Sequence, residues 1–431
     1  MTPDNAQQNI VILGAGFGGI ACAMRLAKLA RKHPASFANY RLLLVDKNDY
    51  HVYTPALYEV ATTASDDAAA LSVKHITTTP LEEIFSNTPV TFIRNTVTSI
   101  DLIAKKVLCD DGASLPFAYM VFALGSEMAY FGIPGVKEHA ISLKWLTDAI
   151  HIRATVRRMY DTKESGGTLS VVVGGGGPTG VEFSAELVGY IGELNRKLKK
   201  NVCPAITVVE GSSTILPGFD QWTVTHARRR LARLGVLLKE GSFVSQADGR
   251  TVFVRSAPNH PEEKLPYDIF IWSGGVQAVN MLANGKLSIE KRGRMETDPF
   301  MLCISPDEHL HVAQNIFAIG DNACFTDPET HRAPPATARL AIEQGKVAAE
   351  NIWCDIHGTP QKPFRTWKYP YVIPLGGKYA VAEIGPFKLR GMLAWFFHEL
   401  VELYYLISIT ADTWTALKRW WKGMEIFSKN D

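Results

Sequence analysis

Two short apolar runs in this chain each end in a glycine cluster, and each cluster opens a long helical pattern. Residues 9–13 lead into Gly14-Ala-Gly16-Phe-Gly18-Gly19, and residues 169–173 lead into a second cluster, Gly175-Gly-Gly177-Pro-Thr-Gly180. An apolar run, a glycine turn and a helical pattern together predict a strand–turn–helix unit. Because the unit occurs twice, we expect an α/β fold with two similar domains.

Each unit is followed by another apolar run that ends in an acidic residue. Residues 40–46 end in Asp46, and residues 205–210 end in Glu210. Free N–H groups at a helix N-terminus favour a pyrophosphate, and an acid behind the second strand can accept hydrogen bonds from ribose hydroxyls. The chain therefore predicts two Rossmann-like dinucleotide-binding domains. For Asp46, the alternative is an acid that only caps a strand.

The two acids carry different information. Asp46 lies 32 residues after Gly14, beyond the usual spacing of about 20, and we attribute the excess to a loop-like insertion at residues 32–39. Glu210 suits a free 2′-hydroxyl and repels a 2′-phosphate, so it favours NADH over NADPH. Residues 211–213 add no arginine that would bind a phosphate.

A third apolar strand, residues 315–320, ends in Gly320-Asp321 and is followed by a proline pair and a helix at 337–352. Further strands are expected at residues 90–100 and 120–124, with a hairpin turn at Asp110-Asp-Gly112. We expect an FAD-binding domain at residues 1–165 and 290–352, split by an inserted NADH-binding domain at 166–289. A C-terminal region covers residues 353–431.

Composition excludes several classes. A chain of 431 residues with 46% hydrophobic residues can bury more than one core, and a net charge of +2 gives no reason to expect nucleic acid binding. The cysteines are not spaced for zinc or a CxxC pair, so buried free thiols are expected. No secretory signal is visible. The six cysteines are Cys22, Cys109, Cys203, Cys303, Cys324 and Cys354.

The two glycine fingerprints with the late Ile319-Gly320-Asp321 resemble the layout of two-dinucleotide flavoprotein disulfide reductase-like enzymes. This resemblance implies FAD at the first fingerprint, a nicotinamide cofactor at the second, and Asp321 at the ribityl or pyrophosphate region of FAD. Disulfide reductases carry a dithiol, typically CxxxxC, near the first FAD helix. Only Cys22 lies there, which excludes that chemistry.

A closer resemblance is to the type II NADH:quinone oxidoreductases. It rests on five blocks in the same order, which cover nearly the whole chain. The resemblance implies an enzyme that passes electrons from NADH through FAD to a membrane quinone without pumping protons. The blocks are His51-Val-Tyr-Thr-Pro-Ala-Leu-Tyr-Glu-Val-Ala-Thr62, Val173-Gly-Gly-Gly-Gly-Pro-Thr-Gly-Val-Glu182, Ile271-Trp-Ser-Gly-Gly-Val276, Phe317-Ala-Ile-Gly-Asp321 with Pro334-Pro335, and Gly376-Gly-Lys-Tyr-Ala380.

The fingerprints and the resemblance together give the expected site residues. Glu182 would shape the contact between nicotinamide and flavin, and Lys378 would sit near the flavin ring or the acceptor. The alternatives are a carboxylate that only stabilises a helix N-terminus and a surface lysine in a glycine turn. The expected FAD contacts are Gly14, Gly16, Gly18, Gly19, Asp46, Lys47, Gly125, Gly320 and Asp321. The expected NADH contacts are Gly175, Gly177, Gly180, Glu210, Gly274 and Gly275.

One segment departs from the family pattern. The family has Ala-Gln-x-x-x-x-Gln beside the flavin, lining the quinone pocket, whereas this chain has Ala338-Arg339 and, further on, Glu343-Gln344. An arginine is charged and cannot accept a hydrogen bond. Either the quinone site at Arg339, Glu343 and Gln344 is reshaped for another acceptor, or Arg339 pairs with Glu343 four residues on.

The C-terminal region suggests a membrane surface. Residues 393–407 form an amphipathic pattern with His398 and Glu402 opposite the apolar stripe, and Lys388, Arg390, Glu399 and Glu402 argue against a membrane span. A second stripe at 414–424 joins tryptophans to basic residues, as at a membrane boundary. Packing on the protein's own core or in a homodimer is the alternative. We expect a peripheral protein on the cytoplasmic face of a bacterial cell membrane.

Two rival functions stay open. One is another quinone-linked flavoenzyme of the sulfide:quinone type, which would need redox cysteines at the flavin. The other is a slow NADH-binding redox sensor, because one fold serves many functions.

Overall fold

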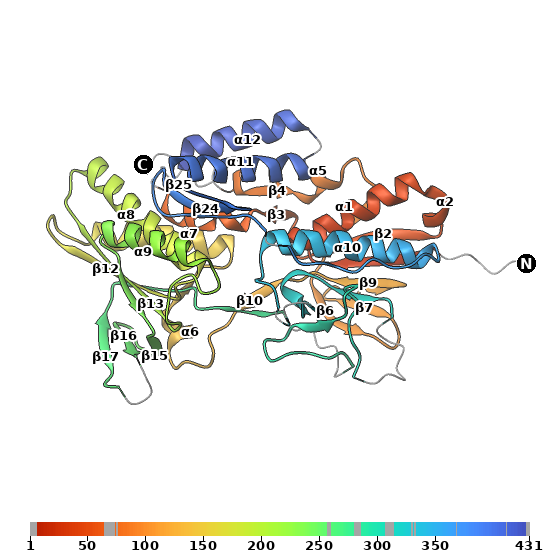
Figure 1. The fold of residues 1–431 in the computed structure, drawn as a ribbon, viewed down its shortest axis with the longest axis horizontal. Helices are drawn as coiled ribbons and strands as arrows, with labels where there is room; N and C mark the ends of the chain where they lie inside the picture. The colour runs from red at the N-terminus through yellow and green to blue at the C-terminus, as the bar shows by residue number, and fades with distance from the viewer. Residues whose placement is uncertain are drawn as a thin grey trace, which may run out of the picture. The chain divides into compact units, whose positions relative to one another are not determined.

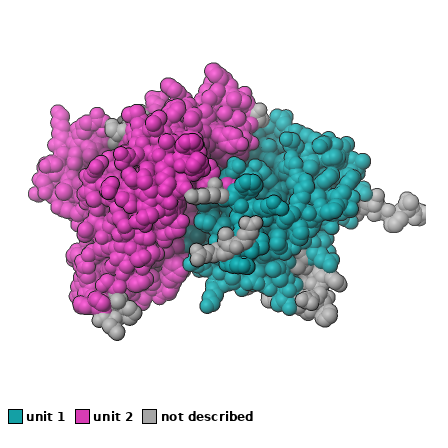
Figure 2. All heavy atoms as spheres, viewed as in Figure 1, with its two compact units in different colours: residues 1–51, 79–127, 276–367 teal, residues 52–78, 128–275, 368–431 magenta. Residues whose placement is uncertain are grey.

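The computed structural model describes residues 7–63, 74, 76–256, 260–279, 286–306, 314–328, 331, 333–367, 369–410 and 412–427. The chain divides into two compact units, coloured separately in Figure 2. Unit 1 holds residues 1–51, 79–127 and 276–367, and unit 2 holds residues 52–78, 128–275 and 368–431. The predicted domain boundaries divide the chain at other places, since residues 52–78, 128–165 and the end of the chain group with the second fingerprint.

Unit 1 is built on a five-stranded parallel sheet in the order β21-β9-β1-β2-β5. Its central strand β1 is apolar and buried, as expected for a strand covered on both faces. Helices α1 (Phe17–Lys32) and α10 (Ala338–Ile356) pack against each other. The strands are β1 (Gln8–Leu13), β2 (Tyr40–Asp46), β5 (Val90–Arg94), β9 (Tyr119–Phe122) and β21 (Ile316–Ala318).

Two sequence-based details of unit 1 change. The expected strand at 90–100 is two strands, because β5 pairs with the parallel sheet whereas β6 (Val97–Asp101) pairs with β7 (Lys106–Cys109) in an antiparallel sheet. The insertion behind α1 is not only a loop, since it forms α2 (Pro34–Phe37). The hairpin at Gly112 is confirmed and joins β7 to β8 (Ser114–Pro116).

Unit 2 repeats the plan with a parallel sheet in the order β11-β18-β12-β13-β14, of which β12 and β13 are labelled in Figure 1. The helix after its glycine turn is α8 (Pro178–Leu198). An antiparallel sheet, β15-β16-β17, packs its apolar residues with this sheet in one core. The strands are β11 (Ile141–Ser142), β12 (Thr168–Gly174), β13 (Cys203–Glu210), β14 (Leu237–Glu240), β15 (Phe243–Ala247), β16 (Thr251–Arg255), β17 (Glu263–Pro266) and β18 (Ile269–Trp272).

The C-terminal part of unit 2 is an antiparallel sheet, β23-β24-β25, followed by helices α11 (Met392–Ile409) and α12 (Thr413–Phe427). Both helices pack together, and α11 also packs on the sheet (Figure 1). The strands are β23 (Tyr371–Pro374), β24 (Ala380–Ile384) and β25 (Phe387–Gly391).

The remaining elements are short, apart from α7 and α9. They are β3 (Tyr50–Val52), η1 (Thr54–Ala56), α3 (Leu57–Thr62), β4 (Thr78–Pro80), α5 (Leu81–Phe85), β10 (Ser126–Met128), α6 (Val136–His139), α7 (Leu146–Asp161), α9 (Gln221–Arg233), β19 (Val276–Ala278), β20 (Met295–Thr297), η3 (Gly320–Asn322) and β22 (Ala323–Phe325).

The side of helix α11 that packs on the protein is mixed, since it buries Ala394, Tyr405, Leu406 and Ile409 together with three polar residues. The apolar stripe of α11 is exposed, with Leu393 at 71% and Tyr404 at 67% of full exposure, whereas His398, Glu399 and Glu402 are buried. The core-packing alternative is therefore wrong for this stripe. By length and composition alone, α11 could cross a membrane. Two charges expected to prevent this, those of Lys388 and Arg390, lie in β25 and not in the helix.

The cysteines are free, and Cys22, Cys109, Cys303 and Cys354 are buried as expected. The expectation was wrong for Cys203, which is exposed, and for Cys324, which is half-buried.

Candidate functional site

The first glycine turn in unit 1 joins β1 to α1, and its glycines have different roles. Gly14 has φ +102°, and a Cβ there would lie 2.3 Å from the Ala123 carbonyl oxygen. A Cβ at Gly19 would lie 1.9 Å from the Gly14 oxygen, so helix and strand could not approach so closely. A Cβ at Gly16, in contrast, would meet nothing within 4 Å. The turn is therefore packed on its protein side and open at Gly16.

Gly18 belongs to a helix crossing and not to the turn itself. A Cβ on Gly18 would lie 3.1 Å from the Ala341 carbonyl oxygen on α10, and a Cβ on Gly345 would lie 2.4 Å from the Gly18 oxygen. This position, expected to contact FAD, thus allows α1 and α10 to approach each other closely.

Asp46 holds the first glycine turn from the end of β2. Its carboxylate accepts hydrogen bonds from the N–H of Ala15 at 2.7 Å and from the N–H of Asn48 at 2.8 Å. Burial raises the pKa of Asp46, and these two backbone donors oppose that rise. A carboxylate has about four lone-pair sites, so it can still accept from a ribose. The neighbouring Lys47 is exposed.

His51 supports the same turn and was not among the expected site residues. Its ring is buried, Nδ1 lies 3.0 Å from the Ala15 carbonyl oxygen, and the Phe17 ring packs edge-on against it. Burial lowers the pKa of His51 to about 4, so the ring is neutral at pH 7. The sequence offered one clue to this role, because His51 is the first residue of the block after β2 that carries part of the family resemblance.

The segment at Gly320–Asn322, which we expect to bind FAD, brings distant residues together within unit 1. The Gly125 N–H donates to the Asn322 side chain at 2.8 Å, and the Ser126 hydroxyl hydrogen-bonds to Asp321. Gly125 and Gly320 have φ of +73° and +62°, which favour glycine. Asn322 was missed because its pairing with Gly125 spans nearly 200 residues of sequence.

Gln344 and Arg339 lie on α10, in the segment expected to bind quinone. Gln344 is 1% exposed and accepts a hydrogen bond from the Gly320 N–H at 2.7 Å, so it holds the turn at Gly320 in place. Arg339 is exposed and forms an ion pair with Glu343 at 3.0 Å, the pairing considered above. Lys346 also pairs with Glu343 at 3.0 Å.

The second glycine turn, in unit 2, repeats the geometry of the first. Gly175 has φ +113°, and a Cβ there would lie 2.6 Å from the Ser273 backbone. A Cβ on Gly180 would lie 2.0 Å from the Gly175 oxygen, while a Cβ on Gly177 would meet nothing within 4 Å. Pro178 begins α8 at a position where no intrahelical donor is needed.

Glu210 occupies the position in unit 2 that Asp46 has in unit 1. Its carboxylate accepts hydrogen bonds from the N–H of Gly176 at 2.6 Å and of Ser212 at 2.6 Å. A Cβ on Gly176 would lie 2.8 Å from the Glu210 Cβ, so the acid packs directly on the turn.

The turn after β18 packs against the second glycine turn, since the Ser273 backbone lies next to Gly175. Gly275 has φ +148°, and a Cβ on Gly274 would lie 2.5 Å from the Trp272 ring. The Trp272 indole donates to the Ala129 carbonyl oxygen at 2.9 Å, which fixes the ring. These glycines therefore let the chain turn tightly over a fixed indole.

Both turns fit the pyrophosphate of a dinucleotide. Gly16 and Gly177 are the N-caps of α1 and α8, and neither helix start has a side-chain cap. Their backbone N–H groups are thus available to an anion, which the helix dipole also favours. The open space at Gly16 and Gly177 is where a phosphate can approach the backbone.

Glu182 and Lys378 are the two residues expected at the redox centre. Glu182 lies near the start of α8, and burial raises its pKa to about 7, against a lowering effect of His398. Lys378 is exposed and follows two glycines with positive φ, Gly376 and Gly377. A Cβ on Gly376 would lie 2.6 Å from the Ala185 carbonyl oxygen, so this turn packs on α8.

Two acids of unit 2, Glu402 on α11 and Glu59 on α3, were not among the expected site residues. Burial, then Glu399, raises the pKa of Glu402 to about 7, and burial with several neighbouring carboxylates raises that of Glu59 well above its usual value. Charged residues inside an otherwise apolar helix, α11, were the available signal.

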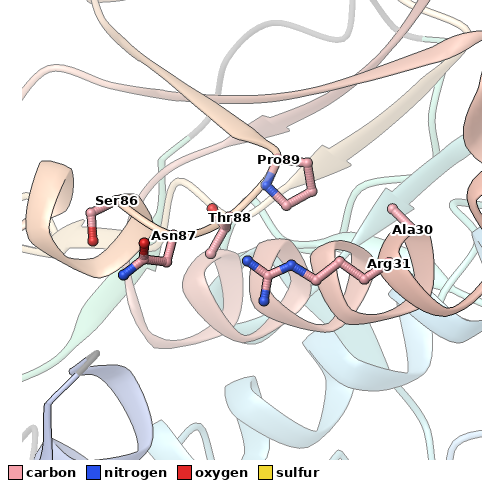
Figure 3. A pocket seen from close by; sticks show the side chains of 6 residues that line it. All are labelled: Ala30, Arg31, Ser86, Asn87, Thr88 and Pro89. Carbon is pink, nitrogen blue, oxygen red and sulfur yellow. The ribbon is translucent and has the colours of Figure 1, made fainter.

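A surface hollow of about 450 Å³ lies in unit 1 between the end of α1 and the segment after α5 (Figure 3). It contains none of the expected site residues and has one charged side chain, Arg31. We assign it no role. Among the described residues, no group of histidine, cysteine and acidic side chains could hold a metal ion.

Comparisons with known proteins agree with this arrangement. The Staphylococcus saprophyticus protein named Type II NADH:quinone oxidoreductase is 29% identical over 402 residues, covering 92% of this chain and 94% of the relative. The structure of NDH2 from Plasmodium falciparum in complex with NADH superposes with a TM-score of 0.79 at 18% identity, covering 98% and 99% of the two chains. The sulfide:quinone oxidoreductase from Aquifex aeolicus superposes with a TM-score of 0.76 at 18% identity, covering 93% and 91%.

At 18% identity, these two solved structures show that this chain has the same fold as each of them. The family model described as pyridine nucleotide-disulphide oxidoreductase matches residues 8–345, which include both glycine turns and the segment at Gly320–Asn322. The chain therefore belongs to the pyridine nucleotide-disulphide oxidoreductase family.

Proposed function

We propose that this protein is an FAD-dependent NADH:quinone oxidoreductase of the type II class. The observation that carries the proposal is the pair of matching glycine turns, each open at one glycine and each locked by an acid, Asp46 or Glu210. The relative named Type II NADH:quinone oxidoreductase, which aligns over 92% of the chain, supports the choice of donor and acceptor.

FAD, when bound, supplies the hydride and electron chemistry. The turn at Gly14–Gly19 would hold its pyrophosphate, Asp46 its adenosine ribose, and Asp321 its central portion. In the same way the turn at Gly175–Gly180 would hold the NADH pyrophosphate, and Glu210 its ribose. The carboxylate of Glu210 would also repel a 2′-phosphate.

Glu182 and Lys378 would act at the redox centre. A carboxyl group whose pKa is about 7 exchanges a proton readily at neutral pH, which suits Glu182 to acid–base work. Lys378, exposed on its glycine turn, would bring a positive charge to the flavin or the acceptor.

The acceptor site would lie along the first turns of α10. Arg339 and Glu343 present an ion pair where the resembling family has a glutamine, while the buried Gln344 accepts a hydrogen bond from the Gly320 N–H. A quinone carbonyl could accept a hydrogen bond from Arg339, since a guanidinium has only donors.

The exposed apolar faces of α11 and α12 support a membrane-surface location. Trp414 is 63% and Trp421 is 65% exposed, and Lys418, Arg419 and Lys422 flank them. Aromatic and basic residues together suit the headgroup boundary. We propose that the protein lies on the cytoplasmic face of a bacterial membrane through these helices, which could also join two copies of the chain.

Steady-state oxidation of NADH with a panel of benzoquinones and naphthoquinones tests the proposal. Rapid oxidation that depends on the quinone supports it. Tight NADH binding with negligible turnover would mean a redox sensor. Sulfide oxidation without NADH would mean the sulfide:quinone type, whose overall fold is similar.

A further inference from the structure

Strands β13 and β14 of unit 2 each end in an acid, and the two acids lie side by side. Glu210 and Glu240 are register partners in this parallel pair of strands. Register partners place their side chains on the same face of a sheet, because successive residues of each strand alternate between its two faces. Two like charges at this spacing repel each other, so the surroundings of the two carboxylates deserve comparison.

Glu240 is paired with a cation from helix α9. The Arg228 Nε donates to Glu240 Oε1 at 3.0 Å, and the Arg228 Nη2 lies 2.9 Å from the same oxygen. The Nη2 group also donates to the Thr214 hydroxyl oxygen at 3.0 Å. Both partners of the ion pair are partly buried, with side chains 34% and 22% exposed. The guanidinium is therefore held by an acid and by the loop that follows β13.

Glu210, in contrast, is bound by backbone groups. Its carboxylate accepts from the N–H groups of Gly176 and Ser212, and no cationic side chain of a described residue pairs with it. Arg228 cancels the charge of Glu240, whereas the charge of Glu210 is left uncancelled. These three side chains together therefore leave one negative charge at the second glycine turn.

The loop after β13 joins the ion pair to the glycine turn. The Ile215 N–H donates to Glu240 Oε1 at 2.6 Å, and the Leu216 N–H donates to the Gly176 carbonyl oxygen at 2.8 Å. A Cβ on Gly176 would lie 3.1 Å from Ile215 Cγ2, so the loop packs on the turn. The ion pair contacts this loop at Thr214 and Ile215. It is thus connected by direct contacts to the turn that we propose to bind NADH.

We propose that Glu240 is a positioning residue that sets the cofactor specificity: it holds Arg228 in an ion pair, so that the charge of Glu210 acts alone on the ribose 2′ position. The inference rests on the proposed function, because it takes the second glycine turn as the NADH site. In dinucleotide-binding folds an arginine near this position accommodates the 2′-phosphate of NADP. An Arg228 released from Glu240 would offer such a cation.

The charges give opposite effects for the two partners of the ion pair. Glu240→Gln leaves Arg228 charged and unpaired, so the affinity for NADP⁺ relative to NAD⁺ should rise by about fivefold. Its amide oxygen can still accept from the Ile215 N–H, which keeps the loop in place. Arg228→Gln leaves a second uncancelled acid, so the same ratio should fall. The double variant removes both charges and should return the ratio to the wild-type value.

Calorimetric titration of the FAD-loaded protein with NAD⁺ and with NADP⁺, at low ionic strength, measures this ratio. The oxidised cofactors bind without reducing the flavin, and low salt leaves the charges least screened. Glu263→Gln is the matched control, because it removes an acid that pairs with Lys239 at 2.8 Å and changes the net charge by the same amount. Lys239 precedes Glu240 in β14 and points to the opposite face of the sheet. The control should therefore leave the ratio unchanged.

The inference is wrong if the ratio fails to rise in Glu240→Gln, or if it moves in the same direction in a folded Arg228→Gln. Equal losses of affinity for both cofactors would mean that the ion pair only stabilises the loop, which also overturns it. Thermal unfolding checks that each variant is folded, and Glu240→Gln alone decides if Arg228→Gln is not. A wild-type protein that binds NAD⁺ but does not oxidise NADH would refute the proposed function, while the affinity ratio would still decide the role of Glu240.

Discussion

Glu210, at the end of β13, accepts a hydrogen bond at 2.6 Å from the backbone N–H of Gly176, which lies in the glycine turn after β12. Asp46 makes the same contact with Ala15 in the other unit, at 2.7 Å. In each case the acid also accepts from the N–H two residues after itself. Each acid that we propose to bind a ribose therefore also stabilises its glycine turn, so one side chain would serve both roles.

The difference between the open and the packed glycines gives the first prediction. Gly16→Ala should fold normally, because its φ of −76° is allowed for alanine and its Cβ meets nothing within 4 Å. It should nevertheless bind FAD weakly, since the methyl group occupies the path of the phosphate. Gly19→Ala should lose about 1–3 kcal/mol of stability, because its Cβ would lie 1.9 Å from the Gly14 oxygen. Thermal unfolding of the apoproteins and FAD titration measure the two effects. Similar stability losses in both variants would contradict the distinction between an open glycine at Gly16 and a packed one at Gly19.

The variant Arg339→Gln should alter the reaction with quinone and leave the reaction with NADH unchanged. Arg339 is exposed and Glu343 is half-buried, so the loss of their ion pair should change the free energy of unfolding by less than about 1 kcal/mol. The KM for NADH should stay unchanged, whereas the order of preference among quinones should change. If all quinones keep their relative kcat/KM values, Arg339 does not line the acceptor site.

The buried Glu402 predicts how stability depends on pH. Its pKa is raised to about 7 in the folded protein, above its usual value of 4.5. The folded state therefore binds the proton more tightly, and the associated stability is present below about pH 4.5 and is lost as pH rises to about 7. Glu402→Gln cannot ionise, so it should be more stable than the wild-type protein at pH 8, with a smaller gain at pH 5.

Denaturant unfolding at both pH values measures this difference. The exposed Glu263 on β17 provides a control, since Glu263→Gln should show no such pH-dependent gain. A Glu402→Gln variant that is less stable at pH 8 than at pH 5, relative to wild type, would contradict the assignment.

Truncation before Trp414 should release the protein from vesicles that contain anionic lipids. The shortened chain loses the exposed tryptophans and the basic residues of α12. Because α11 keeps its own apolar face, the remaining affinity should be low and insensitive to salt. Vesicle sedimentation measures it, and binding equal to that of the full chain would rule out α12 as the anchor.

Features that depend on a few neighbouring residues could be predicted from the sequence. Gly14, Gly175, Asp46 and Glu210 could be assigned because a tight turn and a strand-end acid each leave a mark within a few residues. The break of residues 90–100 into β5 and β6 was not predictable, since it depends on which sheet each half joins.

Non-local contacts explain the other differences. Gln344 matched a quinone motif, but its oxygen accepts the Gly320 N–H, a pairing that the motif does not encode. For α11, periodicity separated an apolar face from a polar face without saying which faces the protein. The answer depends on the elements that α11 packs against, which are β23, β24, β25 and α12.

Anaerobic mixing of the FAD-loaded protein with NADH or with NADPH tests the transfer of hydride to the flavin, which is followed by the loss of the oxidised flavin's visible absorbance. We expect rapid bleaching by NADH, much slower bleaching by NADPH, and a smaller difference between them in Glu210→Gln, where the repelling charge is gone. Equal rates with the two cofactors in the wild-type protein would contradict the role of Glu210, and no bleaching with either would contradict the transfer of hydride to the flavin.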